Sequence, residues 1–296
     1  MAHVKGVLAF AFITINTVWW SIPIYVMAAI RVLTPWDGAR RTLSAAMTRM
    51  IDGWVGCNRW MLAALRVTRI EEDWAGAPEL RPDGWHVVIS NHQGWSDILV
   101  LQTTFLRRIP PLKFFVKQVL IWVPGVGLAM WLMDFPFVRR FPRTELEANP
   151  SLREIDRLAT LAACERFKHR PTTALSFLEG TRFTPEKRQA QGSQYEHLLM
   201  PKTGGFGYVV AALGTRVDKA TDVTIFYPEG VPTFWEFLCG KCPIVRIEIR
   251  ARDIPDELQV GGDELSEPAR ERLKRWVTEV WEAKDARLDE LIRVGR

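Results

Sequence analysis

The chain has 296 residues, of which 48% are hydrophobic and 25% are charged. This balance excludes a disordered chain, and the length allows one large domain or two modest ones with a substantial core. The net charge of +5 favours an anionic partner such as phospholipid headgroups or phosphorylated metabolites. We expect no nucleic-acid partner, because no recognition motif accompanies the charge. The 13 tryptophans suit membrane interfaces as well as cores.

Residues 7–30, VLAFAFITINTVWWSIPIYVMAAI, contain no charged side chain. With a rise of about 1.5 Å per residue, a helix of this length crosses a hydrocarbon layer of about 30 Å. Pro23 removes one backbone donor and predicts a kink. The segment is too long for the apolar region of a cleavable signal peptide, and Lys5 is the only lysine or arginine before it. We therefore predict membrane insertion rather than a signal peptide or a buried core helix.

Residues 38–66 predict a second, amphipathic helix. Its apolar residues recur at spacings of three and four: Leu43, Met47, Met50, Trp54, Cys57, Met61 and Leu65. It would lie on the bilayer surface or turn back beside the first helix, so a true span and a two-helix anchor in one leaflet both fit. We predict that residues 1–66 are a membrane anchor and residues 67–296 a separate domain.

Basic residues follow the first apolar segment, namely Arg31, Arg40, Arg41 and Arg49. By the positive-inside tendency, this side of the membrane and the rest of the chain are cytoplasmic. The expected location is the cytoplasmic face of a plasma or inner membrane.

From about residue 67 the pattern alternates predicted strands with predicted helices. The strands are 85–90, 173–178, 221–227 and 244–250, and the helices are 97–107, 151–168, 204–214 and 267–293. Such interleaving predicts an α/β domain with a mixed sheet flanked by helices. The charges of the last helix are interpreted as a solvated face. Residues 118–138 are apolar but too interrupted by proline and glycine for a span, so they form either a buried core segment or a groove for an acyl chain.

Two of the four cysteines, Cys239 and Cys242, form the string CGKC. A Cys-x-x-Cys pair is a redox pair or half of a zinc site, but no second pair or histidine cluster stands nearby in the sequence. We interpret them as reduced thiols in a turn, in a reducing compartment.

The string NHQGWSD, residues 91–97, follows a predicted buried strand. On one continuous helix His92 and Asp97 would lie about 140° apart, so they meet only if His92 is in the loop and Asp97 in the first helical turn. Gly94 supplies the corner, and Ser96 is the predicted N-cap. Asp97 would then fix the tautomer of His92 and leave the other ring nitrogen free as a base. The alternative is that His92 only caps a turn.

Ser96 is a poor candidate for the nucleophile. A nucleophile elbow needs glycine two residues after the serine, and Ile98 stands there. We therefore expect a hydroxyl of the substrate to be the nucleophile.

A second polar string, FLEGTR at residues 177–182, also follows a predicted strand. Gly180 permits close backbone approach, and Arg182 offers a planar fork for a phosphate. If strands 85–90 and 173–178 are parallel neighbours, His92 and Glu179 open into the same crevice. Other basic residues either serve this crevice or solvate the surface: Lys117, Arg139, Arg140 and Lys202.

These strings resemble the glycerophospholipid acyltransferases, which include 1-acylglycerol-3-phosphate acyltransferase. NHQGWSD matches the family block of Asn-His, four residues and Asp, and FLEGTR matches Phe-Pro-Glu-Gly-Thr-Arg with Leu178 in place of proline. The stretch from Lys117 to Arg140 follows the course of a second block, with Arg139 in place of its acid. PKTGGF and DVTIFYPEG are looser matches to later blocks. The resemblance spans residues 85–250, and the overall layout resembles the lysocardiolipin-acyltransferase-like branch more than the short, standard bacterial enzymes.

The resemblance implies a glycerol-3-phosphate acyltransferase-like fold and a role in phospholipid biosynthesis at the membrane. It implies that His92 is the general base and Asp97 its partner. The acceptor phosphate would be held by Glu179, Gly180, Thr181 and Arg182, with Lys117 and Arg140 as further substrate contacts. The donor would be acyl-CoA or acyl-acyl carrier protein, with no metal or other cofactor.

The expected reaction transfers a fatty acyl group to the free hydroxyl of a lysophospholipid, with lysophosphatidic acid as the first choice. Two alternatives stand beside it. One is a membrane-bound thioesterase or lipid hydrolase that uses the same His-Asp pair to activate water. The other is a non-catalytic lipid-binding membrane protein.

Overall fold

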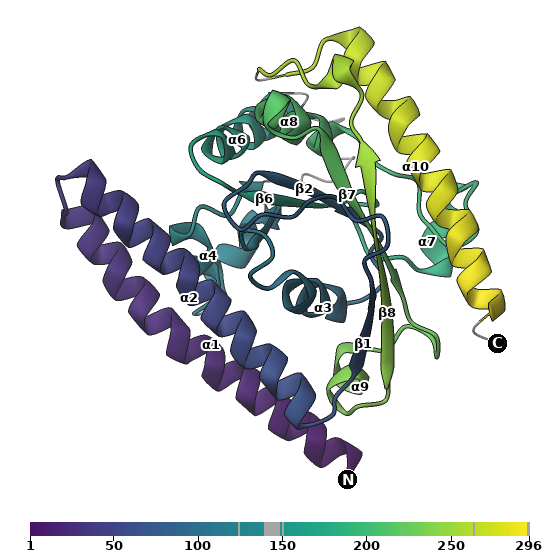
Figure 1. Cartoon of the computed structure of the whole chain (residues 1–296), viewed down its shortest axis with the longest axis horizontal. Coiled ribbons are helices and arrows are strands. Elements are labelled where there is room, and N and C mark those ends of the chain that lie inside the picture. The colour runs from purple at the N-terminus through teal and green to yellow at the C-terminus, as the bar shows by residue number, and fades with distance from the viewer. Residues whose placement is uncertain (124, 139–148, 150, 263, 295–296) are drawn as a thin grey trace.

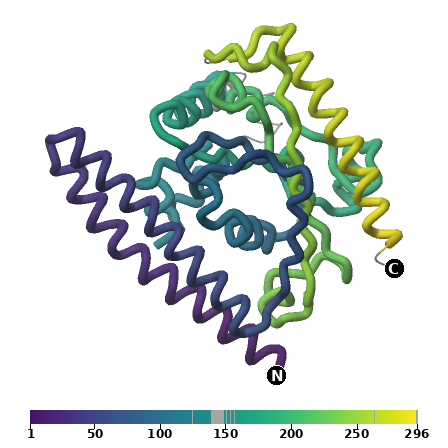
Figure 2. Tube along the Cα trace, viewed as in Figure 1, coloured from purple at the N-terminus to yellow at the C-terminus, as the bar shows by residue number. Residues whose placement is uncertain are grey.

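The computed structural model describes residues 1–123, 125–138, 149, 151–262 and 264–294 (Figure 1). It consists of a long helical hairpin beside an α/β body (Figure 2). The hairpin is formed by α1, Ala2–Leu33, and α2, Asp37–Ala64, which run antiparallel. Helix α1 continues through Pro23 as one element.

Polar side chains and close packing hold the two helices of the hairpin together. Asn16 Nδ2 donates to the carbonyl of Trp54 at 3.0 Å and to Asn58 Oδ1 at 2.9 Å. Gly53 allows the helices to approach, because an added Cβ there would lie 2.4 Å from the Trp20 ring. A buried amide pair in an apolar hairpin costs free energy unless its hydrogen bonds are made, so these contacts set the register of the two helices.

The predicted apolar stripe of the second helix is only partly correct. Met47 and Met61 are buried, but other predicted members are half-buried, and the buried face also includes Ile51, Val55, Asn58 and Leu62. The face is rotated because α2 packs against α1 on one side and against the body, including α3, on the other.

The body is built on a six-stranded sheet in the order β1-β8-β7-β2-β6-β3. Its strands are β1 Arg69–Asp73, β2 His86–Ser90, β3 Leu112–Phe114, β6 Thr173–Phe177, β7 Lys219–Phe226 and β8 Ile244–Asp253. All neighbours are parallel except β7 and β8. A second, two-stranded sheet pairs β4, Val116–Lys117, with β5, Phe137–Val138. The predicted mixed α/β fold is confirmed.

Helices cover both faces of the sheet because successive strand residues point to opposite sides. Val87 and Ile89 pack with α6 Ser151–Lys168, α8 Gly204–Leu213 and α10 Glu267–Val294. Val88 packs on the other face with α3, Ser96–Phe105, and with the hairpin. The remaining elements are short: η1 Gln118–Trp122, α4 Gly127–Leu132, α7 Pro185–Gln191, η2 Gly214–Arg216, α9 Phe234–Leu238 and η3 Asp256–Leu258.

The described part of the apolar segment 118–138 is buried only in part, at positions that include Ala129, Phe135 and Val138. Most side chains of η1 are exposed, with Trp122 at 83%, whereas α4 exposes Leu128 and Trp131 and packs Ala129 against the hairpin. The segment is tied to α1, because Ser21 Oγ and Tyr25 Oη both donate to the carbonyl of Gly125, at 2.9 and 2.8 Å. It therefore extends the apolar surface of the hairpin.

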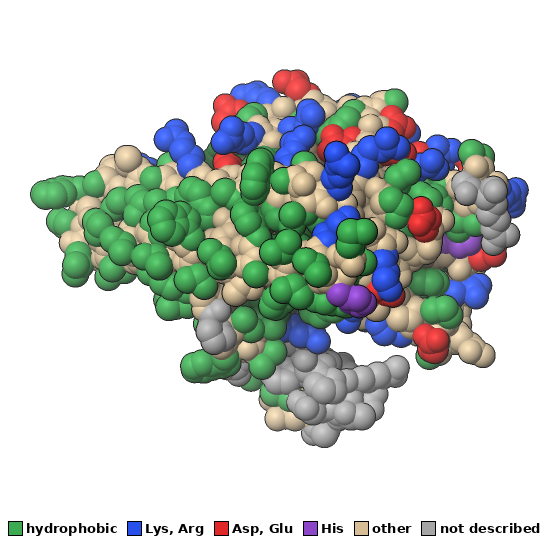
Figure 3. All heavy atoms as spheres, turned by 90° about the horizontal axis from the view of Figure 1, so that it is seen from below, with side chains coloured by type: hydrophobic (Ala, Val, Ile, Leu, Met, Phe, Trp, Pro, Cys, Tyr) green, Lys and Arg blue, Asp and Glu red, His purple; other side chains and the backbone are tan. Residues whose placement is uncertain are grey.

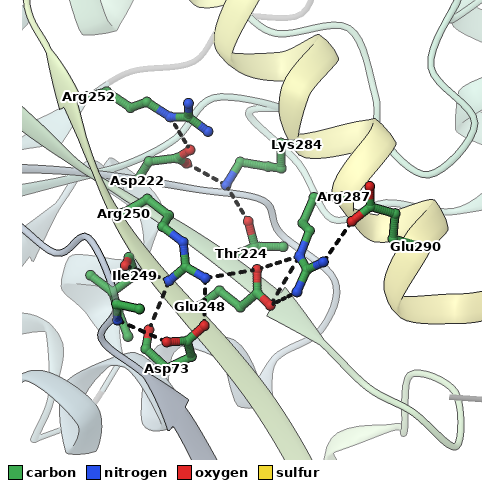
Figure 4. A network of polar contacts seen from close by, with 11 residues as sticks. Asp73, Asp222, Thr224, Glu248, Ile249, Arg250, Arg252, Lys284, Arg287 and Glu290 are labelled. Atoms are coloured by element: carbon green, nitrogen blue, oxygen red, sulfur yellow. Dashed lines mark hydrogen bonds and ion pairs between the residues drawn. The ribbon is translucent and has the colours of Figure 1, made fainter. Parts of the chain in front are cut away.

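The charges of α10 include one buried lysine, which differs from the predicted solvated face (Figure 4). Lys284 Nζ forms an ion pair with Asp222 Oδ1 at 2.5 Å and donates to the carbonyl of Val223 at 2.6 Å. Asp222 also accepts from Arg252 Nε at 2.9 Å. Next to this pair, Arg287 binds Glu248 of β8 with two of its nitrogens. These contacts fix α10 across β7 and β8.

We expect Lys284→Ala to lower the free energy of unfolding by about 3–5 kcal/mol, because Asp222 stays buried but loses one of its two cationic partners. Chemical denaturation of the purified protein measures the change. Lys274→Ala on the same helix is the control, since its ion pair with Glu271 is exposed to solvent and contributes little to stability. Equal losses in the two variants would contradict the role assigned to Lys284.

Candidate active site

The candidate site lies where β2 and β6 end. These strands are parallel neighbours with Ser90 opposite Phe177, so the loops that follow them leave the sheet at the same edge. Asn91 anchors the first loop to β7, because its amide donates to the carbonyl of Ile225 at 2.9 Å and accepts from the Ile225 N–H at 2.8 Å. The sequence interpretation did not assign a role to Asn91, although a polar residue directly after a buried strand is a signal for such an anchor.

His92 and Asp97 meet at the predicted loop-to-helix corner. His92 Nδ1 lies 2.8 Å from Asp97 Oδ2, and the same oxygen accepts from the N–H groups of Gln93 at 2.6 Å and Gly94 at 2.9 Å. The ring stacks on Phe177 with a centroid separation of 4.1 Å. Asp97 is fully buried, whereas the His92 side chain keeps 15% of its surface exposed. In the described part of the chain Nε2 has no hydrogen-bond partner, so it is available to take a proton.

Tyr227, at the end of β7, completes the surroundings of Asp97. Its hydroxyl donates to Asp97 Oδ1 at 2.6 Å and lies 2.8 Å from Ser96 Oγ. Burial, followed by the charge of Asp97, raises the pKa of Tyr227 well above its ordinary value, so the phenol stays protonated and can donate. The sequence interpretation did not identify Tyr227.

The predicted N-cap role of Ser96 is wrong. The N-cap of α3 is Trp95, and Ser96 is the first helical residue, buried with its hydroxyl against Tyr227. This position also takes Ser96 away from the opening, which agrees with a nucleophile supplied by the substrate.

Glu179 differs from the role that the family resemblance implied. Its carboxylate is fully buried and accepts from the N–H of His92 at 2.7 Å and of Leu199 at 2.9 Å. Burial raises the pKa of Glu179 to about 7. The Phe183 N–H donates to the carbonyl of His92 at 2.7 Å, so the backbone of His92 is held on both sides. Glu179 therefore positions the histidine loop and does not present its oxygens to an acceptor phosphate.

The remaining FLEGTR residues bring basic groups to this edge. Gly180 has φ of +69°, and an added Cβ would lie 3.2 Å from Lys202 Cδ, so glycine lets the Lys202 side chain pass over the turn. Arg182 stacks on the Trp95 ring at 4.6 Å. Lys187 of α7, which the sequence interpretation missed, donates to Thr181 Oγ1 at 3.0 Å and to the carbonyl of Arg182 at 2.8 Å.

Of the two other predicted substrate contacts, one does not join this group and the other is not described. Lys117 is exposed on β4, in the small second sheet, and makes no contact with the FLEGTR residues within the part that the structure describes. Arg140, like Arg139, lies outside the described residues.

The sequence was compared with models of known protein families. A family model described as Acyltransferase matches residues 75–231, which is more than half of the chain. The chain belongs to the Acyltransferase family. The family resemblance found from its motifs is thereby confirmed.

The chain is moderately similar in sequence to several named acyltransferases. Lysocardiolipin acyltransferase 1 of Gallus gallus is 28% identical over 225 residues, which cover 71% of this chain and 54% of that protein. The mouse protein of the same name is 29% identical over 68% of this chain and 53% of its own. The 1-acyl-sn-glycerol-3-phosphate acyltransferase 2 of Brassica napus is 26% identical over 58% of this chain and 42% of its own. This family member spans about half the length of these relatives.

A solved structure shares the fold over nearly the whole chain. The crystal structure of the 1-acyl-sn-glycerophosphate (LPA) acyltransferase PlsC from Thermotoga maritima superposes with a TM-score of 0.55 at 17% identity. The match covers 97% of this chain and 99% of that chain. The fold therefore includes the hairpin as well as the sheet.

We expect Tyr227→Phe to lower kcat for acyl transfer about tenfold or more with little change in KM, because it removes the buried hydrogen bond that fixes the Asp97 carboxylate and, through it, the orientation of the His92 ring. A carboxylate with one donor fewer stabilises the imidazolium more strongly, so the ascending limb of the pH–rate profile should move to higher pH. Steady-state kinetics across pH measures both effects. Tyr208→Phe, half-buried against the core on the other face of the sheet, is the matched control. An unchanged pH profile in Tyr227→Phe would contradict the positioning role.

Glu179 should make stability depend on pH. Because its pKa is raised from 4.5 to about 7 in the folded protein, its contribution is fully present below about pH 4.5 and is lost as pH rises through 7. Relative to Glu179→Gln, the wild-type free energy of unfolding should fall by about 3 kcal/mol across this window. Melting curves at a series of pH values measure the difference. The exposed Glu257→Gln should keep the wild-type profile, and parallel wild-type and Glu179→Gln profiles would overturn the prediction.

Proposed function

We propose that this acyltransferase transfers a fatty acyl group from acyl-CoA or acyl-acyl carrier protein to the free hydroxyl of a lysophospholipid. Lysophosphatidic acid is the proposed acceptor, and phosphatidic acid the product. The observation that carries the proposal is the His92–Asp97 pair, with Nε2 free in the described structure, at the same sheet edge as the basic turn formed by Gly180, Thr181 and Arg182.

The geometry supports general-base catalysis. His92 Nε2 removes the proton of the acceptor hydroxyl as the oxygen attacks the thioester carbonyl. Asp97 stabilises the imidazolium that forms, and its own position is fixed by Tyr227 and two backbone N–H groups. The tetrahedral intermediate then collapses, the C–S bond breaks, and the proton on Nε2 passes to the departing thiolate. A thioester is already activated and its thiolate leaves readily, so the proposed reaction needs no metal or other cofactor.

Positive charge at the basic turn supports a phosphate-bearing acceptor. Arg182 can bind a phosphate through its planar guanidinium while Trp95 holds it in place by stacking. Lys202 and Lys187 add charge beside the same turn. We also propose that Lys117 and Arg140 contact the substrate, as the family block that they delimit implies.

An apolar face supports binding at a membrane (Figure 3). Helix α1 is long and apolar enough to cross a bilayer by length and composition. Its exposed side chains continue onto η1 and α4, and they include Leu8, Ile15, Trp19, Ile22, Val26, Trp122, Leu128 and Trp131. Such a large continuous apolar surface is rare on a soluble monomer.

Contacts along α1 favour a hairpin that lies within one leaflet over a perpendicular span. Near its start, Lys5 Nζ donates to the carbonyl of Arg66, and Gly6 packs against Cys239. In its second half, Ser21 and Tyr25 bind Gly125. The body thus flanks most of the helix, and a perpendicular span would carry polar parts of the body into the hydrocarbon. We propose that the body lies on the cytoplasmic face, because four arginines follow the apolar segment.

We expect His92→Ala to lower the rate of acyl transfer from acyl-CoA to lysophosphatidic acid by about 10²–10⁴-fold, because the general base is lost. Mass spectrometry of the products in mixed vesicles measures the rate and identifies the product. An unchanged melting temperature is the control for folding.

The same assay separates the alternatives. Undiminished turnover by His92→Ala would contradict the mechanism. Release of free fatty acid without an acylated lipid would select the hydrolase, and an inactive wild-type enzyme over a panel of lysophospholipids and both donors would select a lipid-binding protein.

A further inference from the structure

A large basic cavity lies at the edge of the sheet opposite to His92. Its volume is about 1140 Å³, and it is lined by the end of α1, one side of α2 and the loops that precede β2, β3 and β6. These loops contribute Asp83, Pro111 and Pro171. Because the three strands are parallel, their amino ends meet here, whereas His92 and Glu179 follow their carboxyl ends. The cavity is therefore separate from the candidate active site.

Arginine dominates the lining of this cavity, which includes Arg31, Arg40, Arg41, Arg49, Arg107 and Arg170. The acidic residues of the lining are Asp37, Asp52 and Asp83, and Asp83 is already paired with Arg81. Within the described ranges, no ion pair engages the four arginines that come from α1 and α2. The excess positive charge therefore has no protein partner there and suits an anion.

A smaller cavity adjoins the first, and basic side chains line it as well. It shares Arg31 and Arg170 with the first and includes Lys113. The pKa of Lys113 is lowered to about 8, chiefly by burial and next by the charge of Arg170, with a further contribution from Arg31. Burial is the larger cause, and the neighbouring arginines lower the pKa of Lys113 further.

The mouth of the cavity borders the apolar face. Arg31 lies in the last turn of α1. Beside it are exposed apolar side chains, namely Ile30 at 47%, Val32 at 73%, Leu33 at 82% and Trp36 at 73% exposure. Positive charge that could bind an anionic headgroup thus lies next to an apolar surface that could contact acyl chains. This combination suits an amphiphilic ligand. A cavity of this volume also exceeds the needs of one phosphate ion.

We propose that this cavity binds the phosphate headgroup of an anionic membrane phospholipid that is not the substrate. The acyl chains of that lipid lie along the exposed end of α1. Guanidinium groups bind phosphate oxygens in pairs, and several arginines near a membrane surface add to one another in their attraction to an anionic leaflet. This inference rests on the membrane placement proposed above.

The test compares the full-length protein on vesicles of phosphatidylcholine with vesicles that also contain phosphatidylglycerol. The variant is Arg41→Gln/Arg49→Gln, and the matched control is Arg275→Gln/Arg293→Gln on α10, which removes the same charge far from the cavity. Wild type and control should bind the anionic vesicles at least about tenfold more tightly than the neutral ones, and the cavity variant should lose about 10–30-fold on anionic vesicles only. Unchanged binding of the cavity variant to neutral vesicles shows that it is folded.

A second measurement separates a lipid from free phosphate. Short-chain phosphatidylglycerol below its micelle concentration should raise the melting temperature of wild type and control but not of the cavity variant. Inorganic phosphate at the same concentration should leave all three unchanged.

The inference would be overturned by an equal rise with inorganic phosphate, by an equal loss in the α10 control, or by full binding of anionic vesicles by the cavity variant. Failure of wild type to bind either kind of vesicle would instead contradict the membrane placement. Equal binding of wild type to both kinds would contradict the second lipid site alone.

Discussion

The buried carboxylate of Asp97 is the group on which the candidate site depends. A buried carboxylate is costly unless its oxygens are satisfied, and here four donors surround it: the His92 ring, the N–H groups of Gln93 and Gly94, and the hydroxyl of Tyr227. Three of these donors come from the loop after β2 and the fourth from the end of β7. Satisfying Asp97 therefore closes the loop onto α3 and ties it to the sheet, and the orientation of His92 follows.

Glu179 complements Asp97 by holding the backbone of the same histidine. One carboxylate binds the His92 ring and the other binds the His92 N–H, while Phe183 binds the carbonyl. The loop has little freedom left, because its ends are fixed by β2 and α3 and its middle by a turn that follows β6. Because His92 is already oriented by rigid elements, little further conformational entropy is lost when a substrate binds.

The sequence predicted what depends on local spacing. His92 and Asp97 are only five residues apart, so a local turn is enough to bring them together. The long helices and central strands were predicted because their apolar residues recur with a clear period. Contacts across the sheet could not be predicted, because Tyr227 is remote in sequence from Asp97 and reaches it only through the strand order β7-β2-β6. Glu179 was misassigned for the same reason: its orientation depends on where Leu199 lies. Strand β1, RIEED, was missed because it is charged and half-buried, without apolar alternation.

The hairpin runs between two edges of the sheet, one with the candidate active site and the other with the basic cavity. The start of α1 packs against α9, and the loop before α9 reaches Gly94 beside His92. The end of α1 carries Arg31 into the basic cavity at the amino ends of the strands. With 32 residues, α1 extends about 48 Å. A lipid held at the far end cannot bring its headgroup to His92, so it would not compete with the acceptor. What it can do is fix the angle of the hairpin in the leaflet, and hence the depth at which His92 meets the lipid hydroxyl.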